Sequence, residues 1–269
     1  MLKGVRRLVI KVGTSVLTTS NNRLDTSYIE ELVEDISALR KRGLELALVT
    51  SGAIAAGMKI LNLNRRPKPL ADVQAAAAVG QSNLMRTYER LFKERGYVVG
   101  QVLLTKDVFN SPLLSSNARR TLKSLFSFGV IPIINENDTV AVDEIRFGDN
   151  DTLSAMVAKS VSADLLIILS DVDGFYVNGK ICSEVNAITN DLMAEARGSN
   201  SEKSVGGMVT KLEAAAIVTK EGKPVIIANG RTEKVLTKLL SGEEIGTVFM
   251  PAGGGLSTAK KLTGKRKKI

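Results

Sequence analysis

Six short apolar segments, rich in β-branched residues, recur along the chain and predict β-strands. They are RLVIKVG (7–13), LELALVTS (44–51), YVVGQVLLT (97–105), GVIPIIN (129–135), DLLIILSD (164–171) and KPVIIAN (223–229). Between them lie stretches with helical spacing, such as Tyr28–Arg42, Asp72–Lys93 and Thr152–Val161. Because the strands are apolar throughout, we expect both of their faces to be buried. This pattern favours an α/β fold of three layers, in which helices cover a mainly parallel sheet.

The chain is predicted to form one domain followed by a short basic end. Its 269 residues suffice for one large α/β domain or two small ones. The polar stretches 62–72 and 195–207 have the length of loops, and FYVNGKI (175–181) predicts a small hairpin because its Asn-Gly pair suits a two-residue turn. After residue 252 the sequence turns glycine-rich and then basic. We therefore expect a domain over 1–252 and a basic tail over 253–269.

Two features of the composition exclude several classes of chemistry. The chain has no histidine, which excludes serine–histidine triads, phosphohistidine intermediates and histidine-bound metals. It has one cysteine, Cys182, so it can form neither an internal disulfide nor a cysteine-based zinc or iron–sulfur site. With no histidine to activate it, Cys182 is expected to be an inert thiol.

The charge balance is basic, with 37 Lys and Arg against 28 Asp and Glu and a formal net charge of +9. Part of this excess lies in KKLTGKRKKI (260–269), which predicts either a solvated, disordered tail or a contact with RNA. Four Tyr, seven Phe and no Trp are few side chains for stacking on bases, so nucleic-acid binding is not favoured. We find neither an apolar run that could span a bilayer nor a signal-peptide pattern, so we expect a cytoplasmic protein.

One stretch, NENDTVAVDEIRFGDND (135–151), runs against this charge balance. It contains four Asp, two Glu and three Asn. It begins where a predicted strand ends, and it leads into the predicted helix 152–161. One of its last three residues can cap that helix, but capping needs a single residue rather than a cluster spread over two loops. Converging carboxylates and amides suit the amino-acid end of a metabolite, which carries an ammonium and a carboxylate.

Ligands of open parallel sheets bind beyond the carboxyl ends of the strands, and the first predicted strand ends in a suggestive motif. It carries Lys11 among apolar residues and is followed by Gly13, which lets backbone approach a ligand closely. Lys11 is either a functional cation, or a residue at a sheet edge, or a residue whose ammonium snorkels to water. The glycine and lysine spacing of a P-loop is absent.

Two further motifs lie where a helix is expected to begin. Ser51 and Gly52 end the second strand, and their backbone N–H groups either hold an anion or belong to an ordinary serine N-cap beside a packing glycine. The stretch SVGGMVTKLEAA (204–215) places two glycines before a helix with Lys211 in its first turn. A cation there opposes the helix dipole, which favours a phosphate clamp over a purely structural role.

Together these motifs resemble the amino acid kinase family, and within it the branch that phosphorylates the side-chain carboxylate of glutamate. The resemblance covers nearly all of residues 1–252, with the motifs in the family's order. It rests on KVGTSVLT (11–18), VTSGAIAAG (49–57), INENDTV (134–140), FGDNDTLSA (147–155), LSDVDGFY (169–176) and GGMVTKLEAA (206–215). The resemblance implies the amino acid kinase fold, a three-layer sandwich with a mainly parallel central sheet.

The resemblance also implies roles for individual residues. Lys11 and Lys211 would contact the transferring phosphoryl group and neutralise its developing charge, and Asp149 would hold the two lysines in place. The substrate-binding residues of the family correspond to Ser51, Gly52, Asn135, Asp138, Asn150 and Asp151. Among these, we expect Asp138 and Asp151 to face the ammonium of the amino acid.

A nucleotide site for ATP is implied as well. Its residues correspond to Lys11, Gly13, Ser170, Asp171, Val205, Gly206, Gly207, Met208, Val209, Thr210 and Lys211. Where the family tends to have hydroxyl residues, this chain has Val205 and Val209, so we expect backbone contacts there. Ser170 stands where threonine is usual and keeps the hydroxyl. Mg²⁺ would bridge the phosphates, and we assign no residue as its direct ligand.

The implied activity is ATP-dependent phosphorylation of L-glutamate, the first step toward proline. The family further implies feedback inhibition by proline and a homo-oligomer, either a dimer or a tetramer. Longer relatives append a PUA domain, and we expect a form without it, because the chain ends where that domain would begin. Aspartokinase and acetylglutamate kinase are the nearest alternatives. Paired acids would serve no purpose in acetylglutamate kinase, because its acceptor has no free amine. A non-catalytic regulatory or RNA-associated protein is a further alternative.

Overall fold

The computed structural model describes residues 4–21, 23–141, 149–198 and 207–251, and of Asp149 and 197–198 the backbone alone. Its centre is an eight-stranded sheet of order β3-β4-β2-β1-β5-β9-β10-β8. The strands are β1 (Arg7–Val12), β2 (Glu45–Val49), β3 (Val99–Leu104), β4 (Ile131–Glu136), β5 (Leu165–Ser170), β8 (Glu184–Val185), β9 (Val225–Asn229) and β10 (Thr247–Phe249). Neighbouring strands run parallel except β9 and β10, which pair antiparallel. The sheet is therefore mainly parallel, as predicted.

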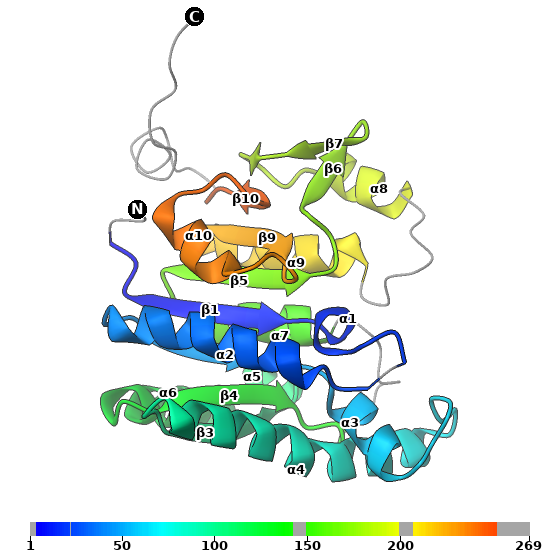
Figure 1. Cartoon of the computed structure of the whole chain (residues 1–269). Helices are drawn as coiled ribbons and strands as arrows, with labels where there is room; N and C mark the ends of the chain where they lie inside the picture. The colour runs from blue at the N-terminus through cyan, green and yellow to red at the C-terminus, as the bar shows by residue number, and fades with distance from the viewer. Residues whose placement is uncertain (1–3, 22, 142–148, 199–206, 252–269) are drawn as a thin grey trace, which may run out of the picture.

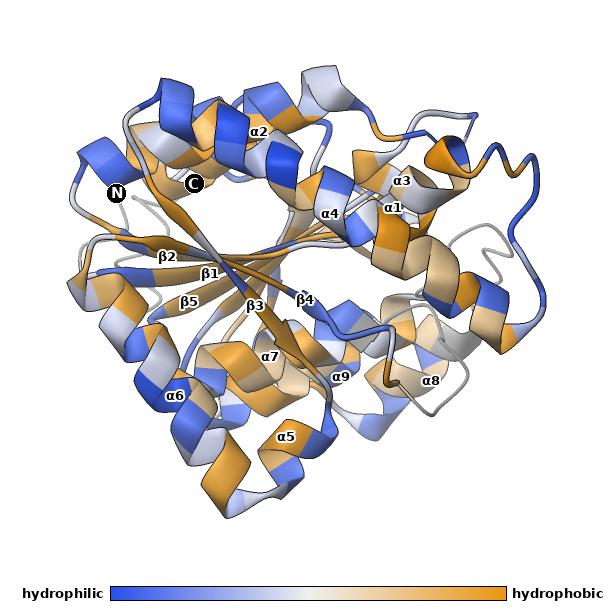
Figure 2. Cartoon of the chain, turned by 90° about the horizontal axis from the view of Figure 1, so that it is seen from below, coloured by the Kyte–Doolittle hydropathy of each residue, from blue (hydrophilic) through white to orange (hydrophobic). Residues whose placement is uncertain are grey.

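Helices cover both faces of this sheet (Figures 1 and 2). One face carries α2 (Thr26–Lys41), α3 (Ala53–Ile60), α4 (Leu70–Glu94) and α10 (Val235–Ser241), and the other carries α6 (Pro112–Ser127), α7 (Asp149–Ser160) and α9 (Met208–Lys220). The remaining helices are α1 (Thr14–Leu17), α5 (Asp107–Asn110) and α8 (Asn190–Gly198). The predicted three-layer sandwich is confirmed. Among the described helices, none is both long enough and apolar enough to cross a membrane.

Each face of the sheet has its own hydrophobic core. Leu8 and Ile10 of β1 pack in the core that contains α2, α4 and α10, whereas Val9 packs in the core that contains α6, α7 and α9. Successive side chains of a strand point to opposite faces, so Lys11 points to the same face as Val9. The amphipathic pattern of the helices and the orange sheet in Figure 2 agree with these two cores. The strand alternation thus directs Lys11 toward α7 and α9.

All six predicted strands are present, but their surroundings differ in part from the prediction. β3 is an edge strand with partly exposed side chains, so the expectation that both faces of every strand are buried is wrong there. β8 and β10 were not predicted, because strands of two and three residues carry too little pattern. Residues 195–198 belong to α8 rather than to a loop.

The predicted hairpin is confirmed. It consists of β6 (Phe175–Val177) and β7 (Lys180–Cys182), which pair antiparallel. The turn residues Asn178 and Gly179 have φ of 50° and 76°. Both values lie in the left-handed region that a two-residue type I′ turn requires, and asparagine and glycine adopt it most readily.

Two glycines let α3 and α4 pack backbone against backbone. A Cβ added to Gly57 would lie 1.7 Å from the carbonyl oxygen of Ala76, and one added to Gly80 would lie 1.8 Å from that of Ala53. Neither position tolerates any side chain at the present helix separation. This contact fixes α4 against the segment that follows β2, and both segments contribute to the site described next.

Candidate active site

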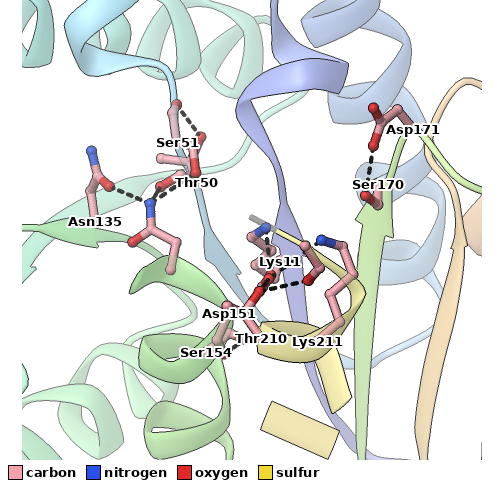
Figure 3. Close-up of polar contacts among 12 residues, drawn as sticks. Lys11, Thr50, Ser51, Asn135, Asp151, Ser154, Ser170, Asp171, Thr210 and Lys211 are labelled. Atoms are coloured by element: carbon pink, nitrogen blue, oxygen red, sulfur yellow. Dashed lines mark hydrogen bonds and ion pairs between the residues drawn. The ribbon is translucent and has the colours of Figure 1, made fainter. Parts of the chain in front are cut away.

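The site lies at the carboxyl ends of four adjacent strands, because the sheet order places β4, β2, β1 and β5 side by side. The first turns of α7 and α9 reach the same edge (Figure 3). β1 runs between β2 and β5, so Lys11 does not lie at a sheet edge. The alternative in which Lys11 extends to water from an edge strand is therefore excluded.

Lys11, Asp151, Thr210 and Lys211 form a group that we call the lysine cluster. Lys11 Nζ lies 2.6 Å from Asp151 Oδ1, and Lys211 Nζ lies 3.5 Å from Asp151 Oδ2. Thr210 donates its hydroxyl to the same Oδ2 at 2.8 Å. The Asp151 side chain has no exposed surface, and the two lysine side chains are 7% and 6% exposed. One buried carboxylate from α7 thus holds two ammonium groups from β1 and α9 side by side.

Burial and charge act in opposite directions on the pKa of Asp151. Burial alone would raise it, but the charges of Lys11 and Lys211 and the bonds from Lys11 and Thr210 outweigh burial, so the pKa is lowered. The pKa of Lys211 is lowered mainly by burial, with a further contribution from Lys11, while Asp151 and Asp171 oppose this shift. Two cations on one anion leave a net positive charge away from bulk water. Such surroundings stabilise an incoming phosphoryl group strongly.

The position of Asp151 corrects one of our expectations. We expected Asp151 to face the ammonium of the amino acid and Asp149 to hold the two lysines. In the structure Asp151 itself makes the lysine contacts, and both of its oxygens are taken by Lys11, Thr210 and Lys211. The side chain of Asp149 lies outside the described residues, and its role stays a prediction.

Ser51, Gln81, Asn135 and Asn150 form a second group, the amide cluster. Asn150 Nδ2 donates to the carbonyl oxygen of Thr50 at 3.0 Å, to Ser51 Oγ at 2.8 Å and to Asn135 Oδ1 at 3.1 Å. Asn135 Nδ2 donates to Gln81 Oε1 at 2.8 Å. These bonds connect β2, β4, α4 and α7. The structure therefore brings Ser51, Asn135 and Asn150 together, as the sequence interpretation requires.

Gly52 has a structural task beside the amide cluster. It is the N-cap of α3 and has a φ of 95°, which favours glycine, and no side chain caps this helix. The neighbouring Ser51 uses its oxygen to accept from Asn150 rather than to cap α3. The alternative of an ordinary serine N-cap is therefore wrong.

Two atoms of the amide cluster, Asn150 Oδ1 and Gln81 Nε2, are buried and have no hydrogen-bond partner among the described residues. An unsatisfied buried polar group costs about 1–3 kcal/mol. Native proteins contain few such groups, and each one that persists calls for an explanation, such as strain, a catalytic role or a bound water or ion. The amide cluster thus offers one open acceptor and one open donor.

A cavity of about 230 Å³ adjoins the amide cluster. It is lined by Gln81 from α4, by Gln101 and Leu103 from β3, and by Asp138 in the segment after β4. Arg66, in the loop between α3 and α4, lies near Asp138. Burial lowers the pKa of Arg66, and the charge of Asp138 opposes this shift. Asp138 therefore belongs to the surroundings of the amide cluster and not to the lysine cluster.

Ser170 and Asp171, two of the residues expected to surround the nucleotide, lie on the other side of the lysine cluster from Asn135 (Figure 3). Ser170 ends β5 and donates its hydroxyl to Asp171 Oδ1 at 3.0 Å. A Cβ added to Gly13 would lie 3.3 Å from Lys11 Nζ, so glycine leaves room beside this ammonium. Gly207 is the N-cap of α9, which has no side-chain cap. Val205 and Gly206 lie outside the described residues.

The sequence interpretation missed Gln81, the carbonyl group of Thr50, and Arg66. Gln81 follows the alanine-rich stretch 75–80 of α4, and no local pattern distinguishes it from an exposed helix residue. Its partner Asn135 is 54 positions away. The polar loop 62–72, which contains Arg66, was recognised only as a loop. Only the tertiary arrangement shows these contributions.

Comparisons with known proteins agree with the geometry. The sequence model of the amino acid kinase family matches residues 6–229. A glutamate 5-kinase of Listeria monocytogenes is 49% identical over 259 residues, which cover 92% of this chain and 94% of the relative. A glutamate 5-kinase of Caldanaerobacter subterraneus is 46% identical over 261 residues, which cover 94% of this chain and 70% of the relative. One from Geobacter sp. is 45% identical over 267 residues, which cover 97% and 72%.

Proposed function

The chain belongs to the amino acid kinase family, and from this premise we propose that it transfers the γ-phosphoryl group of ATP to the side-chain carboxylate of L-glutamate. The products are ADP and L-glutamyl 5-phosphate, and the reaction is the first step of proline biosynthesis. The observation that carries the proposal is the pair of buried ammonium groups on Asp151, in a chain 49% identical to a glutamate 5-kinase.

The chemistry suits the residues present. A glutamate side chain has a reference pKa of about 4.3, so it is ionised at neutral pH and needs no general base. This agrees with a chain that contains no histidine. One carboxylate oxygen forms a bond to the γ-phosphorus as the bond from that phosphorus to the β–γ bridging oxygen breaks, and ADP leaves with the electron pair. Catalysis then consists of positioning and charge stabilisation, for which Lys11 and Lys211 are placed.

For the nucleotide, we propose the side of the lysine cluster that carries Gly13, Ser170 and Asp171, together with residues 205–211. The uncapped N-terminus of α9 supports this, because backbone N–H groups and the helix dipole favour phosphate there. Lys211 lies in the same first turn, with its ammonium in the lysine cluster. Val209 offers no side-chain hydrogen bond, so backbone contacts serve at that position.

We propose Mg²⁺ as the accompanying ion. It would neutralise charge on the phosphates of ATP while keeping several water ligands, which requires few protein ligands. Among the described residues, no group of three or more His, Cys, Asp or Glu side chains could hold a metal ion, and we assign no residue as its ligand.

For the acceptor, we propose that glutamate lies along the amide cluster with its side-chain carboxylate toward the lysine cluster. Asp138 would take the ammonium, and Ser51, Gly52, Asn135 and Asn150 would hold the remainder. The open acceptor Asn150 Oδ1 and the cavity beside Asp138 support this direction. The reacting end of glutamate then meets cations, and its amino end meets an acid.

We also propose a cytoplasmic homo-oligomer, a dimer or tetramer, that is inhibited by proline. The oligomer and the inhibition come from the family resemblance, whereas the location, the domain limits 1–252 and the basic tail 253–269 are proposed from the sequence pattern. Size-exclusion chromatography with light scattering measures the oligomeric state, and ADP release at rising proline concentrations measures the inhibition.

An ADP-release assay with four acceptors tests the proposed function. We expect release with L-glutamate and little with L-aspartate, N-acetylglutamate or UMP, and trapping with hydroxylamine should yield the acyl hydroxamate. N-acetylglutamate lacks the amine that Asp138 would bind, and UMP would bring a phosphate to an acidic site. Equal or faster release with any of the three would overturn the assignment of glutamate.

A further inference from the structure

Two backbone groups fix which side-chain atoms donate and which accept in the hydrogen bonds of the amide cluster. The carbonyl oxygen of Thr50 can only accept, so the atom of Asn150 beside it is Nδ2. The backbone N–H of Glu136 can only donate, and it donates to Asn135 Oδ1 at 2.9 Å. Asn135 therefore presents Nδ2 to Gln81, which must accept with Oε1.

Because Gln81 accepts with Oε1, its donor Nε2 is left without a partner in the part of the chain that the structure describes. Its Nε2 points away from Asn135, is buried, and has no hydrogen-bond partner among the described residues. Rotating the amide by half a turn would place Nε2 against Asn135 Nδ2, donor against donor. A flip of the Gln81 amide would therefore lose the hydrogen bond to Asn135. An acceptor brought by a ligand would satisfy it.

The cavity beside Gln81 indicates which acceptor is suitable. Gln81 and Asp138 both line this cavity of about 230 Å³. A hydrogen-bond donor and a carboxylate in one cavity match the two charges of an amino acid, whose carboxylate accepts and whose ammonium donates. At its other end, the amide cluster reaches Asn150, the neighbour of Asp151 in the lysine cluster. The two ends of the cluster thus correspond to the two ends of glutamate.

We propose that Gln81 is a specificity-determining residue that donates from Nε2 to the α-carboxylate of the acceptor. The inference rests on the proposed function, since it concerns the α-carboxylate of glutamate. Asp138 then binds the ammonium, Gln81 binds the α-carboxylate, and the side-chain carboxylate lies at the lysine cluster. Asn135 and Asn150 have a second task, because they fix the direction in which Gln81 donates.

The test compares three acceptors that differ in one group. L-Glutamate carries the α-carboxylate and the ammonium, 4-aminobutyrate lacks only the α-carboxylate, and glutarate lacks only the ammonium. We would measure kcat/KM for each, or the inhibition constant against glutamate where turnover is too slow. The variants are Gln81→Met, which removes donor and acceptor at similar volume, and Gln81→Glu, which keeps the acceptor for Asn135 and removes the donor.

In Gln81→Met, the preference for glutamate over 4-aminobutyrate should fall about 10- to 100-fold, the range expected for a hydrogen bond to a charged group. The preference for glutamate over glutarate should change less than about twofold, because the ammonium is held elsewhere. Gln81→Glu should bind glutamate more weakly than Gln81→Met, since it sets one carboxylate against another.

Glu89→Met is the control, because Glu89 is exposed on the same helix α4 and does not line this cavity. It should leave both preferences unchanged. Equal losses with glutamate and 4-aminobutyrate in Gln81→Met, or recovery in Gln81→Glu, would overturn the inference and make Gln81 a support for Asn135. If the unaltered chain released no ADP with glutamate, the proposed function would fall first and this inference with it.

Discussion

The lysine cluster and the amide cluster lie at the same edge of the sheet, but their polar groups are satisfied in opposite ways. In the lysine cluster, Asp151 contacts Lys11 and Lys211 and accepts from Thr210, so its charge is fully paired. In the amide cluster, neutral side chains bond to one another, and two atoms, Asn150 Oδ1 and Gln81 Nε2, stay without partners among the described residues.

The two clusters differ in the free-energy cost of leaving a polar group unpaired before a ligand binds. A buried charge that loses its partner destabilises a protein by about 3–5 kcal/mol, so the lysines need Asp151 when no phosphate is present. An unpaired neutral amide costs about 1–3 kcal/mol, which a folded domain can carry. On the proposed function, the phosphoryl end would therefore be organised in advance by charge, and the acceptor end would keep open positions for its substrate.

The largest effect is expected from removing a cation of the lysine cluster. Lys211→Ala should lower kcat by about 10³-fold, because one of the two groups proposed to stabilise the transferring phosphoryl charge would be lost. Lys11 keeps its bond to Asp151, so the protein should still fold. Steady-state ADP release measures the effect. Lys220→Ala, an exposed position in the last turn of the same helix, is the control, and near-normal kcat in Lys211→Ala would place Lys211 outside the reaction.

An intermediate effect is expected where α3 and α4 support the amide cluster. Gly80→Ala should lower the free energy of unfolding by about 3 kcal/mol, because the new Cβ would meet the carbonyl of Ala53. KM for glutamate should rise more than KM for ATP. Urea denaturation measures the stability, and Ala75→Gly, at an exposed position of α4, should cost only about 1 kcal/mol from helix propensity. A smaller loss in Gly80→Ala than in this control would contradict the close packing.

The smallest effect concerns the pH dependence of stability. The folded pKa of Asp151 lies below its ordinary value of 3.8, so its stabilising contribution is present above pH 3.8 and is lost as the pH falls through the folded pKa. The difference in unfolding free energy between the unaltered chain and Asp151→Asn should be constant from pH 7 to about pH 5 and shrink below 3.8. Urea titrations across this range measure it. A difference that grows toward low pH would show that Asp151 is not held as an anion.

Much of the fold follows from local pattern, because runs of buried residues report the strands directly. All six apolar segments form strands, and the Asn178-Gly179 turn was predictable from its φ requirement. β8 and β10 were not, since strands this short are formed by pairing with neighbours rather than by their own pattern. The exposure of β3 follows from its place in the sheet order, which a single segment does not encode.

The site was predictable in its parts but not in its contacts. Lys11 was conspicuous because a charge within a buried strand needs a partner. Which partner it has depends on the rotation of α7, and the sequence offers both Asp149 and Asp151. Gln81 gave no signal, because its role arises from a bond to Asn135 on a different element.

In the proposed reaction two acids have separate tasks, Asp138 for the ammonium of the acceptor and Asp151 for the lysines. The most direct measurement is the ratio of kcat/KM for glutamate to that for glutarate in Asp138→Asn and Asp151→Asn. We predict that this ratio falls about 30-fold in Asp138→Asn, which loses the partner of the ammonium. In Asp151→Asn it should change less than about twofold, while kcat falls alike with both acceptors. A ratio that collapses in Asp151→Asn and survives in Asp138→Asn would contradict the account.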